Sequence, residues 1–489
     1  MNNSMENKSE LKTKTIKAFI WKFLGGISSQ AVSFVVSIIL ARILMPSEYG
    51  VIALSMIFLN VAQVFVTTGL GTSLVQKKDA DELDFSTIFH AGIVVSVLLY
   101  AVLFLSAPLL ANIYHNEQIT NVFRALGLIL PVSAINSVQQ ASVQRNLDFK
   151  KYFYATFTGT TFSGIVGILM AYHGFGVWAL VGQQLSAAVA NTFTLNRIIT
   201  WRPRLIFSWS RFKALFGYGS KLMGSNLLGT ICNELKGFLI GIYYKPADLA
   251  FYNRGDSYPS LVANNITQTI NSVLFPVMAK LQDNPQEVKA ATRRSMMTSS
   301  FVIVPIMLLL AATADKIIII LLTEKWAMAI PFMQVVCINK CVDILGTANL
   351  QALNATGHSG LTLKLEFIKK PIFIIFIAIG ATISPLAIAL GNLLYSIFGT
   401  TINAWPNRKY LHYGLLEQLK DIYPPLLLSA FVGIVIYFMG HLHINIIVLL
   451  LLQCMVGIVL YLGLASLFKM ESYLYVKTTF QGFLKKRSL

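Results

Sequence analysis

Charged residues are scarce in this sequence of 489 residues, and acidic residues are scarcer than basic ones. Only 12% of the residues are Asp, Glu, Lys or Arg, whereas 55% are hydrophobic. A water-soluble protein carries roughly twice that charged fraction. One soluble core has no room for so much apolar surface, so lipid must solvate much of it. The composition therefore excludes a soluble globular protein and predicts an integral membrane protein.

Cysteines are few, and nucleotide-binding loops and long polar connections are absent. The four cysteines all lie in apolar segments, at Cys232, Cys337, Cys341 and Cys454. Cys337 and Cys341 share a helical face, but no nearby His or Cys completes a zinc site. No GxxxxGK[ST] loop occurs, and no connection reaches the ~50 residues of a small soluble domain. These absences predict a protein that is not an enzyme and that carries no cofactor and no metal.

Long apolar runs dominate what is present. Each is close to the ~20 residues that cross the hydrocarbon core as a helix. Helices are expected because every backbone N–H and C=O must be satisfied within its own segment. The runs lie at about 18–40, 50–75, 86–112, 119–143, 152–172, 177–199, 215–241, 250–279, 294–314, 327–353, 361–382, 386–406, 422–440 and 443–468. The sequence therefore predicts an all-α integral membrane protein with about 14 transmembrane helices.

The basic residues indicate the orientation. The net charge of +18 does not form one patch of the kind that binds nucleic acid, because most cations lie in short connections between apolar runs. Most fall in alternate connections, and the positive-inside rule places those connections in the cytoplasm. Lys364, Lys369 and Lys370 are counted among these cytoplasmic cations. Both the N- and C-termini are therefore predicted to be cytoplasmic, with the first apolar run as an uncleaved span.

A short pattern occurs twice. Pro46-Ser47-Glu48 follows the first run, and Pro246-Ala247-Asp248 follows the seventh. The spacing predicts two six-helix lobes of the same orientation, related by a pseudo-two-fold axis along the membrane normal, with two further C-terminal helices. The predicted divisions are a cytoplasmic arm at 1–17, an N-lobe at 18–200, a cytoplasmic linker at 201–214, a C-lobe at 215–410, and the last two spans with a basic cytoplasmic tail at 411–489.

Polar side chains recur at helical spacing inside several runs. The run at 250–279 carries Arg254, Asn265 and Gln268 on one face, and the run at 327–353 carries Lys340, Asp343 and Gln351. Such stripes are costly against lipid. They face either a water-filled cavity or a neighbouring helix to which they hydrogen-bond.

Charges at membrane depth are mostly positive. The cations are Arg124, Lys236, Arg254 and Lys340, and the acids are Glu234 and Asp343. A cavity surrounded by such cations suits an anionic head group such as a diphosphate. Alternatives stay open, because Lys236 lies where it could snorkel to the interface and Lys340 could pair with Asp343 at i,i+3. Arg124 and Arg254 lie near the starts of their runs, where either could be interfacial.

Four segments carry a resemblance to a known family. They are Leu40–Gly50 (LARILMPSEYG), Gly69–Gln76 (GLGTSLVQ), Leu249–Arg254 (LAFYNR) and Ala355–His358 (ATGH). Through them the sequence resembles the bacterial polysaccharide-export flippases (Wzx type, lipopolysaccharide or capsule biosynthesis) of the multidrug/oligosaccharidyl-lipid/polysaccharide exporter superfamily. The resemblance extends over essentially the whole chain.

This resemblance implies a function. A member of the family flips undecaprenyl-diphosphate-linked oligosaccharide repeat units from the cytoplasmic to the periplasmic leaflet by alternating access, for O-antigen, capsule or exopolysaccharide synthesis. It implies a multi-pass protein of the bacterial cytoplasmic (inner) membrane and a monomer. The implied partners are the lipid-linked oligosaccharide, membrane lipid, a polysaccharide polymerase and a chain-length regulator, and no nucleic acid.

The family offers no invariant motif, so the predicted site rests on the helical faces. The predicted substrate-binding residues are Arg124, Lys236, Arg254, Lys340, Asn265, Gln268 and Gln351. Glu234 and Asp343 are predicted to couple transport to a proton or sodium gradient.

Two other functions are weighed. A multidrug/cation antiporter of the same superfamily needs acids in its cavity, whereas the first six runs hold no carboxylate at membrane depth. A membrane polysaccharide polymerase or glycosyltransferase needs a long periplasmic loop with catalytic groups, and the sequence has none.

Overall fold

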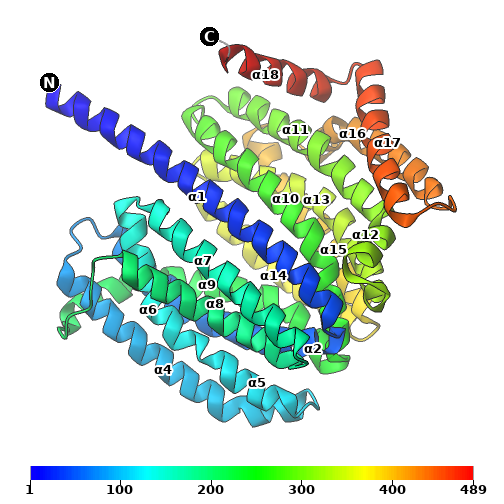
Figure 1. Cartoon of the computed structure of the whole chain (residues 1–489). Helices are drawn as coiled ribbons and strands as arrows, with labels where there is room; N and C mark the ends of the chain where they lie inside the picture. Colours follow the sequence, from blue (N-terminus) through cyan, green and yellow to red (C-terminus); the bar gives the residue numbers. More distant parts are fainter. Residues whose placement is uncertain (1, 488–489) are drawn as a thin grey trace. The chain divides into compact units, whose positions relative to one another are not determined.

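The computed structural model describes residues 2–487, and every regular element in that range is a helix (Figure 1). The chain divides into two compact units, Met1–Ala250 and Phe251–Leu489. Helix α10 (Pro246–Lys280) begins in the first unit and continues in the second. The prediction of an all-α protein is confirmed, whereas the predicted lobe boundaries stay predictions.

The first unit contains nine α-helices before α10 and one short π-helical turn. They are α1 (Asn2–Ile43), α2 (Pro46–Gln63), η1 (Val64–Thr68), α3 (Gly69–Gln76), α4 (Glu82–Ile113), α5 (Gln118–Gly127), α6 (Ile129–Asn146), α7 (Phe149–Tyr172), α8 (Val177–Ile198) and α9 (Trp209–Tyr243). The run predicted at 50–75 is interrupted by η1, and the run at 119–143 is split between α5 and α6. From Asn2 onward, the predicted arm at 1–17 is helical and forms the first part of α1.

Small residues allow the helices of this unit to approach closely. Helix α7 packs against α1 and α8, and it carries Gly164 at the contact with α1. A Cβ atom on Gly164 would lie 2.5 Å from Cγ2 of Val36. Close packing of this kind supplies the attraction between helices in lipid, where the hydrophobic effect does not drive association.

The second unit continues from α10 with six longer helices and three shorter ones. They are α11 (Pro285–Ala312), α12 (Ala314–Leu322), η2 (Glu324–Ala329), α13 (Ile330–Ala355), α14 (Ser359–Ala381), α15 (Pro385–Tyr410), α16 (Leu415–Met439), α17 (Ile446–Leu467) and, turning away from α17 in Figure 1, α18 (Glu471–Arg487). Helix α13 packs against α11 and α15, and α14 packs against α15. The short helices α12, η2 and α18 were not predicted from the sequence.

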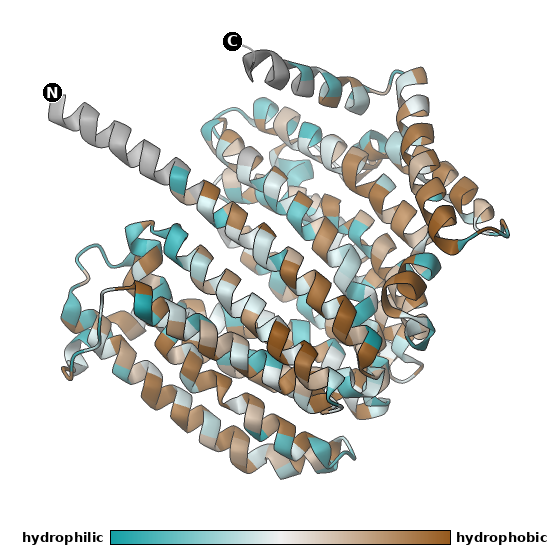
Figure 2. Cartoon of the chain, viewed as in Figure 1, coloured by the Kyte–Doolittle hydropathy of each residue, from teal (hydrophilic) through white to brown (hydrophobic). Residues whose placement is uncertain are grey.

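Ten segments of the described chain are long and apolar enough to cross a membrane. They are Ile20–Ile43, Pro46–Gln76, Glu82–Ile113, Gln118–Asn146, Phe149–Tyr172, Pro285–Ala312, Glu324–Ala355, Pro385–Tyr410, Leu415–Met439 and Ile446–Leu467. Hydrophobic residues predominate on α4 and α17 in Figure 2, and Leu105 on α4 is 77% exposed and Val459 on α17 is 65% exposed. Such surfaces require lipid around them. The prediction of a multi-pass membrane protein is confirmed.

Four more helices have the length of a span and either a more polar sequence or, in α14, more charged residues. They are α8, α9, α10 and α14, with 22, 35, 35 and 23 residues. With the ten apolar segments they match the fourteen predicted runs. Because only ten of these fourteen described segments are apolar enough to count as spans, the count of about 14 spans stays a prediction. The cytoplasmic location of the termini stays a prediction as well.

The repeated sequence pattern has the same local structure in both places. Helices α2 and α10 each begin with a proline and a capping acid. The Met45 N–H donates to Oε2 of Glu48 at 2.7 Å, and the Lys245 N–H donates to Oδ2 of Asp248 at 3.0 Å. The two junctions also touch within the first unit, because a Cβ atom on Gly50 would lie 2.0 Å from the Pro246 carbonyl oxygen.

Candidate functional site

In the first unit, a carboxylate and an amide meet between α2 and α9. Asn60 Nδ2 donates to Oε1 of Glu234 at 2.9 Å, and both residues are half-buried. Lys236 lies two residues further along α9, is half-buried and acts electrostatically on Glu234. A carboxylate whose hydrogen bond comes from a neutral amide keeps its capacity to bind a proton or a cation. We call this arrangement the Asn60–Glu234 pair.

In the second unit, four helices line a partly open, polar cavity of about 230 Å³. Its polar lining comes from α10, α13, α14 and α15, and comprises Asn264, Thr267, Lys340, Asp343, Thr347, Lys369, Tyr395, Ser396, Thr400 and Asn403. We call it the polar cavity. Polar groups in the interior of membrane helices are costly unless they meet partners, water or a ligand, so this cluster is the strongest candidate site in the unit.

Asp343 is the centre of the hydrogen bonds in the polar cavity. Ser396 Oγ donates to Oδ1 of Asp343 at 2.9 Å, and Asn339 Nδ2 lies 3.4 Å from Oδ2. Lys340 Nζ lies 4.0 Å from the same Oδ2 atom. The predicted i,i+3 ion pair therefore forms at the longest N···O distance that still counts as an ion pair. Both side chains also line the cavity. Loose pairing leaves the ammonium able to turn toward an anionic ligand.

Lys369 is a cavity residue that the sequence analysis assigned to a cytoplasmic connection. The structure places it within α14, 4% exposed, in an ion pair with Glu366. Lys370 lies 3.8 Å from the same carboxylate. The i,i+3 spacing of Glu366 and Lys369 inside an apolar run was the signal that could have identified it, because such pairs allow charges to enter a membrane helix.

One lining residue offers an acceptor without a partner in the described part of the chain. Asn403 is 5% exposed, and its Nδ2 lies 3.4 Å from the Gly346 carbonyl oxygen. Its Oδ1 atom is buried and accepts no hydrogen bond from any described residue. Buried polar atoms in native proteins almost always find a partner, so this oxygen is available to a hydroxyl, a water or an ammonium group.

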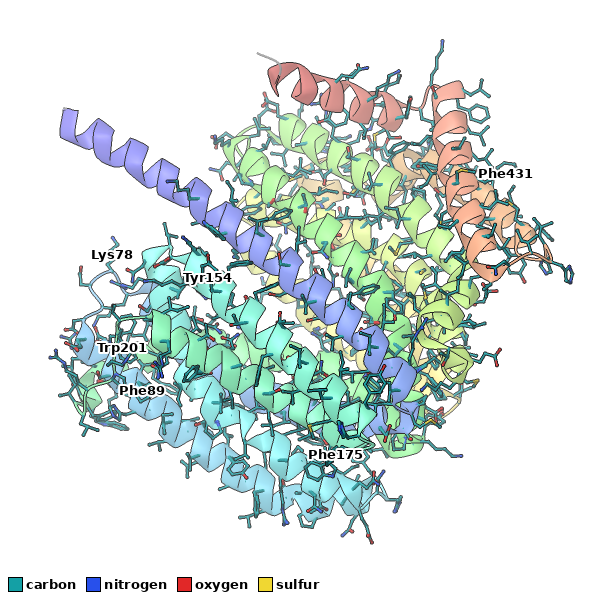
Figure 3. All side chains as sticks on the ribbon, viewed as in Figure 1. Lys78, Phe89, Tyr154, Phe175, Trp201 and Phe431 are labelled. Atoms are coloured by element: carbon teal, nitrogen blue, oxygen red, sulfur yellow. The ribbon has the colours of Figure 1, made fainter. Side chains whose placement is uncertain are left out.

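A charged cluster joins the ends of three helices in the first unit. Asp84 is fully buried, with Lys77 Nζ at 2.5 Å and Arg211 Nη1 at 3.3 Å. Asp81 caps α4 by accepting from the Asp84 N–H, and this hydrogen bond lowers the pKa of Asp81 below its usual value. Figure 3 shows Lys78, Phe89 and Trp201 at the same end of the unit. The cluster joins α3, α4 and α9.

A second charged cluster joins α11, α16 and α18. Arg293 Nε donates to Oδ1 of Asp421 at 2.8 Å and its Nη2 to Oε2 of Glu471 at 3.0 Å. The Tyr413 hydroxyl donates to Oδ2 of Asp421 at 2.7 Å. Burial, together with this hydrogen bond, raises the pKa of Tyr413 above its usual range. These contacts fix the helix ends on one side of the unit. The polar cavity is lined by residues nearer the middle of the helices.

Residues 39–331 match the model of a family described as "Polysaccharide biosynthesis protein". The match covers more than half of the chain. The chain belongs to this family. The resemblance identified from the sequence is thereby confirmed, and so is its placement as a multi-pass protein of a bacterial inner membrane.

Several relatives of this chain are similar over most of their length. The lipopolysaccharide biosynthesis protein WzxC of Escherichia coli (strain K12) is 21% identical over 436 residues, 88% of each chain. The teichuronic acid biosynthesis protein TuaB of Bacillus subtilis (strain 168) is 22% identical over 77% of this chain and 78% of its own. The succinoglycan biosynthesis transport protein ExoT of Rhizobium meliloti (strain 1021) is 22% identical, and the match spans 65% of each chain, just under two thirds of ExoT.

Two solved structures show the fold. The lipid II flippase MurJ, in an inward closed conformation, superposes with a TM-score of 0.75 at 14% identity, over 92% of this chain and 98% of MurJ. An inward-facing multidrug resistance MATE transporter of the MOP superfamily superposes with a TM-score of 0.62 at 12% identity, over 81% and 98% of the two chains. The chain therefore shares the fold of these membrane proteins.

The structure brings together two of the nine predicted site residues in the polar cavity. These are Lys340 and Asp343. The cavity lining on α10 comes from Asn264 and Thr267, each one residue before a predicted position, so about 100° away around the helix. Asn265 and Gln268 are themselves exposed, and Asn265 Nδ2 donates to the Leu261 carbonyl of its own helix at 2.8 Å.

The other predicted residues lie elsewhere. The Arg124 guanidinium packs 4.3 Å from the centre of the Phe104 ring on α4, and Nε donates to the Phe104 carbonyl at 3.3 Å. The Arg254 guanidinium lies 5.5 Å from the ring centre of buried Trp326 in η2. Gln351 is half-buried on α13 outside the cavity lining. Glu234 and Lys236 belong to the first unit, and the functional roles of all these residues stay predictions.

Proposed function

We propose that this protein is a flippase that moves undecaprenyl-diphosphate-linked oligosaccharide repeat units from the cytoplasmic to the periplasmic leaflet. The observation that carries the proposal is the polar cavity with Lys340, Lys369 and Asp343, in a member of a polysaccharide biosynthesis family with the fold of a lipid II flippase. The names of the relatives, which include a transport protein, support a transporter and not an enzyme. The product would be O-antigen, capsule or exopolysaccharide.

The proposed transporter has fourteen membrane-spanning helices and alternates between two openings. The ten apolar segments and the four long polar helices α8, α9, α10 and α14 supply these spans. Two lobes with both termini in the cytoplasm then follow from the distribution of cations and from the matching starts of α2 and α10. The protein acts as a monomer, beside a polysaccharide polymerase and a chain-length regulator.

The cations recognise the diphosphate in this mechanism. At an effective dielectric constant of ~20, two opposite unit charges 4 Å apart attract each other by about 4 kcal/mol. Lys340 and Lys369 supply such charges in the polar cavity, and Arg124, Lys236 and Arg254 are proposed to contribute along the path. Hydroxyl and amide groups, including those of Asn265, Gln268 and Gln351, meet the sugars, while the polyprenyl chain stays in lipid.

Asp343 and Glu234 are the proposed coupling groups. Each accepts a hydrogen bond from a neutral side chain, Ser396 or Asn60, and each can take up a proton or sodium ion. A proton or sodium ion that neutralises Asp343 weakens its hold on Lys340, so uptake of the ion frees the ammonium group for the anionic substrate. The antiporter alternative draws support from the shared MATE fold, but the family match favours the polysaccharide substrate.

The test uses a strain whose surface polysaccharide is lost when this gene is deleted. The strain is complemented with Lys340→Ala, Lys236→Ala or Arg254→Ala, and Lys364→Ala serves as the control because Lys364 is exposed on α14. Loss of polymer with accumulation of a lipid-linked repeat unit accessible only from the cytoplasm supports the proposal. Normal polymer in all three variants refutes the cationic path, and loss of polymer without that intermediate refutes flipping as the step.

A further inference from the structure

A second, larger cleft lies in the second unit between α14, the C-terminal end of α15 and the first turn of α16. Its volume is about 850 Å³, within the range of small-molecule sites. None of its lining residues lines the polar cavity. Because the cleft is placed at helix ends, it lies where membrane meets water. We call it the interfacial cleft.

The walls of the interfacial cleft are apolar and open to the surroundings. Trp405 on α15 is 74% exposed, Leu416 on α16 is 78% exposed, and Ile368 on α14 is 54% exposed. Tryptophan is enriched at the head-group level of membranes, where its ring suits the border between lipid and water. Exposed Phe398 and Leu394 continue the apolar surface along α15, away from its end. Such a surface suits acyl chains.

The polar end of the interfacial cleft is positive. Arg408 lines it from the last turn of α15 and is exposed. Glu417 is the acidic side chain among the described lining residues, and its carboxylate is paired with Lys289 Nζ at 2.8 Å. The described lining therefore contains no carboxylate left over for Arg408. A guanidinium in this situation is suited to bidentate contact with a phosphate.

The first turn of α16 adds donors at the same end. Gly414 is its N-cap residue, lines the cleft, and supplies no side-chain cap. The first N–H groups of a helix have no partner inside the helix, and together with the helix dipole they favour an anion. Gly414 also lies against Arg408, with its ideal Cβ position 3.7 Å from the arginine Cγ. The guanidinium side chain and the helix N-terminus thus border one space.

We propose that the interfacial cleft binds an anionic phospholipid. Its phosphate lies between the Arg408 guanidinium and the first N–H groups of α16, and its acyl chains lie along Trp405, Ile368 and Leu416. Basic pockets between membrane helices bind anionic head groups in this way. The site is separate from the polar cavity, so the inference goes beyond the proposed transport function and does not depend on it.

The test measures lipid binding to the purified full-length protein in detergent by native mass spectrometry. The probes are dioleoylphosphatidylglycerol and, as the uncharged comparison, dioleoylphosphatidylcholine. Arg408→Gln should weaken phosphatidylglycerol binding about tenfold or more, because it removes a charge-assisted hydrogen bond. Lys409→Gln is the matched control, because it removes the same charge from the neighbouring position outside the cleft lining, and it should change binding less than ~2-fold.

Two further variants keep the test decisive. Trp405→Ala should weaken binding of both lipids and preserve the preference for the anionic one. Arg408→Lys should retain part of the binding if charge is what matters, and it provides a folded comparison if Arg408→Gln is unstable. Equal losses in Arg408→Gln and Lys409→Gln would overturn the proposal in favour of general surface charge. Equal affinity of the wild type for both lipids would also overturn the proposal. So would an experiment in which undecaprenyl phosphate, and no other lipid, displaces phosphatidylglycerol.

Discussion

Replacing Lys369 with Met separates a structural role of this lysine from a role in transport. Lys369 is 4% exposed and ion-paired with Glu366, whose side chain is 35% exposed and also has Lys370 at 3.8 Å. Removing one partner of a fully buried pair costs about 3–5 kcal/mol. Since Glu366 stays partly solvated and keeps Lys370, we expect a smaller loss of about 1–2 kcal/mol in the free energy of unfolding.

The double variant Lys369→Met/Glu366→Gln distinguishes the two roles. It removes the carboxylate left behind by the single substitution, so stability should return to near the wild-type value. If Lys369 contacts the diphosphate, surface polymer stays absent in the double variant although the protein is stable. Thermal unfolding in detergent and surface polymer in the deletion strain are measured together, with Lys364→Met on the same helix as the control. Polymer restored along with stability would refute the reasoning.

Three further predictions concern other parts of the chain. Glu234→Gln should abolish the dependence of transport on pH while keeping the protein folded, because Gln can still accept the hydrogen bond from α2; an unchanged pH dependence would exclude Glu234 as a coupling group. Gly50→Ala should lower the free energy of unfolding by about 1–3 kcal/mol through overpacking, because its Cβ would lie 2.0 Å from the Pro246 carbonyl oxygen. Gly26→Ala, which meets nothing within 4 Å, should not destabilise, and equal melting temperatures of the two variants would contradict the close contact. Asp81→Asn keeps an N-cap but removes a carboxylate whose pKa is lowered below 3.8 in the folded state. The Asp81 carboxylate therefore stabilises the fold above pH ~4, and this stabilisation is lost as the pH falls through the folded-state pKa. The melting temperatures of wild type and variant should converge in acid, and a difference that does not change with pH would contradict a stabilising role of the charge.

The sequence predicted the helices better than their interruptions. Each apolar run corresponds to a long helical segment, because hydropathy and backbone satisfaction leave few other choices in lipid. The π-helical turn at Val64–Thr68 and the split between α5 and α6 have no comparable signal. They follow from how side chains of one helix fit their neighbours, which a hydropathy average does not contain.

The candidate site was predicted only where it lies on one helix. Lys340 and Asp343 share a face of α13, and periodicity identified them. On α10 the same argument selected Asn265 and Gln268, but rotation by one residue moves the lining to Asn264 and Thr267. Polar residues occur on both faces of α10, so periodicity alone could not identify which one meets α13. That choice depends on the neighbouring helices.

The polarity that weakens some spans also marks where the chain contains chemistry. Helices α8, α9, α10 and α14 are long enough to cross a membrane, yet none is among the ten apolar segments. Three of them carry candidate residues, with Glu234 on α9, Asn264 on α10 and Lys369 on α14, while Lys340 and Asp343 lie on α13, in one of the ten apolar segments. The fourth, α8, makes amide contacts to α6, where Gln139 Nε2 donates to Oδ1 of Asn196 at 2.9 Å. In a protein whose solvent is lipid, each such residue raises the cost of insertion. Polar and charged residues inside a long helix therefore show where to look for the substrate path, whether or not the helix as a whole is apolar.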